Sequence, residues 1–125
     1  MRSFNKSLSI IVVLAGILII AGCGSKQSNS HGDAIQNRSP IDMGTILKDP
    51  NSFAGQTVTV QGKIVRECPT GCWLDLQGDN GALYVDLNPS GFAIPQKVGK
   101  TALIEGEVKV KNNKATLVGK GVEIQ

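Results

Sequence analysis

The sequence predicts an all-β domain: a small closed barrel of five short antiparallel strands in Greek-key order, preceded by one short helical turn. Three observations lead to this prediction. From residue 57 onward the chain contains strand-length segments in which apolar and polar residues alternate. Turns rich in Gly, Asn and Asp separate these segments, and a glycine interrupts the first of them at position 62. A period of two is typical of strands that bury one face, and such strands can close into a barrel.

The folded domain is expected to begin near Ile41 and to cover residues 41–125. Asp42 is suited to cap a short helical turn over 43–48, because an Asp side chain accepts hydrogen bonds from the free amides at the start of a helix. Pro50 ends this turn, since the residue before a proline is disfavoured in the helical region.

Five segments are expected to form the strands. Gly62 lies where the first strand can bend sharply. The run Gly78–Gly81 predicts a hairpin turn between the second and third strands, and 92–98 is expected to be a loop or a short helical turn. The expected strands are 57–64, 72–77, 82–87, 101–110 and 115–124. The residues of the second and third strands that alternation places inside are Leu74, Leu76, Leu83, Val85 and Leu87.

The segment 46–123 resembles small OB-domain lipoproteins and periplasmic proteins. The runs that carry the resemblance are Phe53–Ile64, Gly71–Trp73, Gly91–Pro95 and Ile104–Val108. The resemblance implies the five-stranded Greek-key OB-fold and, by analogy, a domain like those that bind nucleic acids. It implies no particular ligand, because folds of this kind carry many unrelated functions.

Residues 1–22 are expected to be a lipoprotein signal peptide. Arg2 and Lys6 give a positive start, an apolar run over 8–21 follows, and the run ends in Ala21-Gly22-Cys23. Two small residues before a cysteine resemble the bacterial lipobox, in which the cysteine thiol receives the lipid. Cys23 is therefore expected to be the lipidated first residue of the mature protein, with an uncleaved anchor or ordinary secretion as the alternatives.

The anchor predicts an exported protein whose domain lies outside the cytoplasm, on the cell membrane or the outer membrane. Gly24, and not an aspartate, follows Cys23, so a signal for retention in the inner membrane is absent from a cell with two membranes. Residues 23–40 are rich in Ser, Asn, Gln and Gly, which predicts a flexible tether. The only histidine of the chain, His31, lies in this tether.

The net charge of +3 is misleading for the mature protein. Arg2 and Lys6 leave with the signal peptide, so 11 basic residues remain against 10 acidic ones. A domain this close to neutrality lacks the basic track that phosphates require, and nucleic acid is therefore a disfavoured partner.

Cys68 and Cys72 are separated by three residues at the connection between the first two strands. Three interpretations stay open for this pair. An exported protein meets an oxidising compartment, which favours a structural disulfide. Two thiolates can also bind copper or zinc, with Met43 or His31 as further ligands, or they can take part in thiol redox chemistry.

Alternation also gives the second and third strands an outer face that combines aromatic rings with carboxylates and amides. Such a face suits a neutral sugar, a peptide or a cation better than nucleic acid, whose phosphates the carboxylates repel. The alternative is that the aromatic rings only cover the barrel. The outer face comprises Trp73, Asp75, Gln77, Tyr84, Asp86 and Asn88.

The function predicted from these features is a membrane-anchored binding or adaptor module of the cell envelope. Its ligand would be a small molecule, a glycan or a protein. A thiol-based metal or redox protein is the alternative. An enzyme is not expected, because no Ser-His-Asp set, phosphate-binding loop or paired catalytic acid is visible, and no cofactor is predicted apart from a metal ion at the cysteines.

Overall fold

The computed structural model describes residues 29–125 of the chain. The predicted signal peptide, Cys23 and the first part of the predicted tether lie outside these residues. Within 29–125, no helix is both long enough and apolar enough to cross a membrane.

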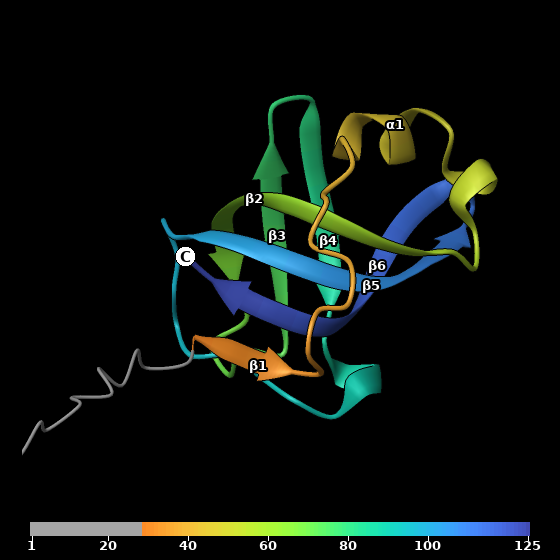
Figure 1. Cartoon of the computed structure of the whole chain (residues 1–125). Helices are drawn as coiled ribbons and strands as arrows, with labels where there is room; N and C mark the ends of the chain where they lie inside the picture. Colours follow the sequence, from red (N-terminus) through yellow and green to blue (C-terminus); the bar gives the residue numbers. More distant parts are fainter. Residues whose placement is uncertain (1–28) are drawn as a thin grey trace, which may run out of the picture.

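Five long strands wrap around one core and form a barrel (Figure 1). Each strand pairs with two neighbours in the order β2–β3–β4–β6–β5, and β5 pairs with β2 to close the ring. The strands are β2 (Thr57–Glu67), β3 (Trp73–Gly78), β4 (Gly81–Asp86), β5 (Thr101–Lys111) and β6 (Lys114–Ile124). The all-β class and the closed five-stranded barrel are confirmed.

The prediction that all strands of the barrel are antiparallel is wrong for one pair. β4 and β6 are parallel, with Tyr84 opposite Thr116 and Asp86 opposite Val118. The reason is geometric: a closed ring with an odd number of strands cannot alternate direction all the way round. The other four pairings of the ring are antiparallel, so the fifth has to be parallel.

The core is built from the inward residues of all five strands and from one short helix. The five leucine and valine residues that alternation places inside, from Leu74 to Leu87, are at most 1% exposed, and Val60 and Ile64 of β2 are fully buried. Burying each such side chain contributes roughly 1.5–3 kcal/mol. The helix α1 (Met43–Lys48) lies over one end of the barrel near the β3–β4 hairpin, and it buries Met43 and Ile46 (Figure 1).

The bounds of α1 agree with the prediction because local chemistry determines both ends. The carboxylate of Asp42 accepts a hydrogen bond of 2.9 Å from the amide of Gly44. At the other end, Asp49 caps the helix and Pro50 begins the 3-10 helix η1 (Pro50–Phe53). A second 3-10 helix, η2 (Asn88–Ser90), precedes the segment 92–98, which is a loop and contains no helix.

The segment 29–40 lies along the barrel, which differs from the unstructured tether expected there. Its strand β1 (Ser30–Gly32) pairs antiparallel with residues 121–123 of β6. β6 pairs with β4 only as far as Val118, so the rest of its outer edge is open for β1. Backbone pairing of this kind leaves no trace in the apolar pattern, which explains why the sequence did not predict it.

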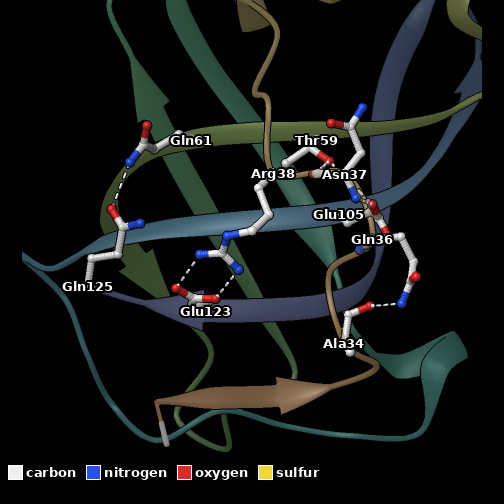
Figure 2. A network of polar contacts seen from close by, with 9 residues as sticks. All are labelled: Ala34, Gln36, Asn37, Arg38, Thr59, Gln61, Glu105, Glu123 and Gln125. Atoms are coloured by element: carbon white, nitrogen blue, oxygen red, sulfur yellow. Dashed lines mark hydrogen bonds and ion pairs between the residues drawn. The ribbon is translucent and has the colours of Figure 1, made fainter. Parts of the chain in front are cut away.

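Polar contacts hold the remainder of this segment against β2, β5 and β6 (Figure 2). Arg38 donates two hydrogen bonds of 2.7 Å to the carboxylate of Glu123. Further along, Thr59 donates to the carbonyl of Asn37 at 2.6 Å, and the carboxylate of Glu105 accepts from the amide of Asn37 at 2.8 Å. The hydrogen bond from Arg38 holds the pKa of Glu123 below its ordinary value.

Candidate functional site

The outer face of β3 and β4 carries the side chains that the sequence predicted as a ligand face. Strand register places Trp73 opposite Asp86 and Asp75 opposite Tyr84, so these four residues lie together. Gln77 is separate from this group, at the far end of β3, where its side chain donates to the carbonyl of Gly78. Asn88 begins η2, and its backbone amide donates to the carboxylate of Asp86 at 3.0 Å.

Trp73 and Tyr84 form an aromatic stack on this face. Their ring centroids are 5.6 Å apart and the ring planes differ by 29°. The two residues are diagonal neighbours across the β3–β4 pair, a spacing that large rings can bridge. The stack is accessible to a ligand, because Tyr84 is 38% exposed.

Arg66 completes this group and was not predicted. Its Nε lies 2.8 Å from a carboxylate oxygen of Asp75, and its guanidinium carbon lies 5.4 Å from the centroid of the Trp73 ring. Strict alternation would place Arg66 on the same face as Ile64, inside the barrel. A bulge between these two positions shifts the register and turns Arg66 outward. The one available signal in the sequence was a charged residue at an inward position.

A hollow of about 330 Å³ adjoins the exposed side of Tyr84. This volume is at the lower end of the range for small-molecule sites. Its apolar part comes from α1 and the strands, and its polar part from Asp75 and from the β5–β6 hairpin. That hairpin turns through Asn112 and Asn113, both with positive φ. The lining residues are Leu47, Asp75, Ala82, Tyr84, Asn113, Lys114 and Ala115.

The electrostatics of the face keep Tyr84 protonated at neutral pH. Partial burial, and after it the negative charge of Asp86, raise the pKa of the Tyr84 phenol above its ordinary value. The hydroxyl is therefore a hydrogen-bond donor as well as an acceptor. With Arg66 paired to Asp75, the face offers donors and acceptors of both charges and no continuous positive track.

Two other hollows, of about 300 and 350 Å³, lie around the start of α1. Asp42 lines both of them. Its carboxylate is already occupied, since it accepts hydrogen bonds from the amide of Gly44 and from the side chain of Asn80. No aromatic residue lines these hollows, and the two hydrogen bonds of Asp42 cap the helix and link it to the β3–β4 turn.

Cys68 and Cys72 lie together at the β2–β3 connection. Both are free cysteines, so the disulfide that their spacing favours is not formed in this structure. Cys68 is buried and Cys72 is half-buried. Among the described residues no group of three or more His, Cys, Asp or Glu side chains could hold a metal ion. His31 lies instead on β1 opposite Val122, and Met43 packs in the core against Gly62 and Gly78.

The strand order and this outer face define the class of the protein as an OB-like barrel with an aromatic and charged surface. No family model matches the chain, and no curated protein matches its sequence. Among solved structures, the chain is similar to a hypothetical protein of E. coli, ygiW. The two share 18% sequence identity, the match covers 76% of this chain and 97% of the other, and the TM-score is 0.46.

Proposed function

We propose that this protein is a membrane-anchored binding module of the cell envelope that holds a small polar ligand against the aromatic stack. The observation that supports the proposal is the placement of the stack beside the hollow. Tyr84 belongs to both, and Asp75 and Lys114 are among the residues that line the hollow. An exposed ring next to paired polar groups is the usual composition of a small-ligand site.

The chemistry of the hollow fits a neutral glycan segment best. A sugar presents an apolar ring face to an aromatic side chain and hydroxyl groups to carboxylates, amides and ammonium groups. Asp75, Asn113 and Lys114 supply those three kinds of polar group. A nucleic-acid strand fits less well, because Asp75 and Asp86 flank the stack and repel phosphates.

Tyr84→Ala is expected to weaken glycan binding about tenfold, which corresponds to about 1.4 kcal/mol. The chain has a single tryptophan, Trp73, so its intrinsic fluorescence reports directly on this face. The measurement is a fluorescence titration with an oligomer of N-acetylglucosamine. Tyr84→Ala retains Trp73, so the same signal remains readable in the variant.

Gln77→Ala is the matched control, since Gln77 lies on the same outer face of β3 but outside the hollow. Its affinity should stay within about twofold of the unchanged protein. A single-stranded oligothymidine serves as the competing ligand class. Tighter binding of the oligonucleotide than of the glycan would refute the proposal, as would an affinity that Tyr84→Ala leaves unchanged.

The anchor belongs to the same proposal. If Cys23 carries the lipid, only residues 24–28 separate it from Asn29, the first residue that the structure describes. Even fully extended, this linker spans no more than about 20 Å. The start of the described structure would then lie close to the membrane surface.

Cys23→Ala is expected to abolish labelling of the protein by a radioactive fatty acid fed to the expressing cells. The reason is that the thiol of Cys23 is the proposed acceptor of the lipid. The measurement is labelling after purification, with Cys72→Ala as the control that removes a different cysteine. Equal labelling of the Cys23→Ala protein would exclude lipidation at this residue.

A further inference from the structure

We infer that Cys68 and Cys72 form a redox-active dithiol that exchanges electrons with a disulfide bond of a partner protein. The inference is independent of the glycan proposal, because it concerns a different group of atoms at the end of β2 and β3.

The backbone around the two cysteines is fixed without any covalent cross-link. The amide of Cys68 donates to the carbonyl of Trp73 at 3.0 Å, and the amide of Gly71 donates to the carbonyl of Cys68 at 2.8 Å. The side chain of Gln96 also donates to the carbonyl of Cys68, at 2.8 Å. A disulfide would therefore add little order to this loop. The same loop can hold the pair reduced or oxidised, which a cycling site requires.

The sulfur of Cys68 is surrounded by hydrogen-bond donors. The thiol of Cys72 donates to it, and the hydroxyl oxygen of Thr70 lies 3.1 Å away. Both groups stabilise the thiolate. The hydrogen bond from Cys72, followed by that from Thr70, lowers the pKa of the Cys68 thiol to about 6. The lowered pKa favours the thiolate of Cys68, and thiolates are the reactive form in disulfide exchange.

The different burial of the two cysteines assigns their roles. Cys72 is the more accessible of the two, and Cys68 is only 9% exposed. A partner disulfide therefore reaches Cys72 first. The hydrogen bond between the sulfurs gives the proton of Cys72 a direct path to Cys68.

The exchange then proceeds in two steps. Cys72 passes its proton to Cys68 and attacks one partner sulfur, the partner S–S bond breaks, and the second partner sulfur leaves and takes up the proton from Cys68. The Cys68 thiolate next attacks the sulfur of Cys72, which releases the first partner sulfur as a thiolate and closes the Cys68–Cys72 disulfide. Two electrons have moved from the cysteine pair to the partner, and the relative reduction potentials decide the direction.

Substitution of each cysteine tests these roles with oxidised glutathione as the probe. The full-length protein, reduced and in detergent, is exposed to the probe, and adducts are located by peptide mass. In Cys68→Ser the resolving thiol is missing, so glutathione should accumulate on Cys72. In Cys72→Ser the accessible thiol is missing, and adduct formation should be at least about tenfold slower.

The unsubstituted protein provides the second measurement. In glutathione buffers of graded composition, both thiols should alkylate at the reducing end and neither at the oxidising end, with a reversible transition between. The ultraviolet absorbance of the thiolate should disappear as the pH falls through about 6, and Cys68→Ser should lack this change. A pair that stays oxidised at the reducing end, a pair that only binds copper or zinc, or equal adduct formation in the two variants would each overturn the inference.

Discussion

Gly71→Ala is expected to remove about 3–5 kcal/mol from the free energy of unfolding. A Cβ atom on Gly71 would lie 1.9 Å from the carbonyl oxygen of Ile94, and the backbone there has a φ of +73°. The left-handed conformation alone costs alanine roughly 1–2 kcal/mol. The clash with backbone also forces apart two hydrogen bonds, from Ile94 to Gly71 and from Gly71 to Cys68, each worth about 1 kcal/mol.

This loss is large for a domain whose total stability is expected to be roughly 5–15 kcal/mol. The midpoint of thermal unfolding, followed by circular dichroism, should fall by about 15–25 °C. Gly91→Ala is a closely matched control, because Gly91 has the same φ of +73° but nothing within 4 Å of its would-be Cβ. It should lose only the conformational part. Equal losses of unfolding free energy in the two variants would show that the close approach of Gly71 to Ile94 does not contribute to stability.

The same loop illustrates why the cysteine chemistry was only partly predictable. The spacing of Cys68 and Cys72 predicts that they lie together, and they do. The spacing does not predict the contacts that other parts of the chain make with this loop. Gln96 and Ile94 come from a segment more than twenty residues further along the chain, and they fix the loop through its carbonyl groups. The contacts that lower the pKa of Cys68 come from Cys72 and Thr70 within the loop itself.

The strands and their buried faces could be predicted from the sequence because the physical cause is local. Each inward residue has to be apolar, so burial of one face produces an apolar residue at every second position of a strand. Strand direction leaves no such mark. The parallel β4–β6 pair follows only from counting the strands of a closed ring, and β1 follows only from the open edge of β6.

The outer face of β3 and β4 was likewise predictable where local alternation determines it and unpredictable where distant segments contribute. Alternation placed Trp73, Asp75, Tyr84 and Asp86 on one side, and the hairpin register brought them together. Arg66 was missed because a single bulged position in β2 reverses its face. The other contributors to the hollow come from α1 and from the β5–β6 hairpin, which only closure of the barrel brings beside β4.

The attachment of α1 leads to the second large prediction: Ile46→Ala should cost about 2–5 kcal/mol of unfolding free energy. Ile46 is fully buried between the helix and the barrel. A helix of six residues has no stability of its own, so its buried side chains have to hold it in place. Urea and thermal unfolding measure the loss.

Leu47→Ala is the control on the same helix, because Leu47 is 37% exposed and should cost no more than about 1 kcal/mol. Leu47→Ala also tests binding with little loss of stability. Leu47 lines the hollow beside Tyr84, so Leu47→Ala should lower the affinity for the ligand directly. Ile46→Ala should lower the affinity indirectly, because it loosens the packing of α1 against the barrel. If Ile46→Ala destabilised the protein no more than Leu47→Ala, α1 would not belong to the cooperatively folded barrel, and the hollow would lack a rigid wall on that side.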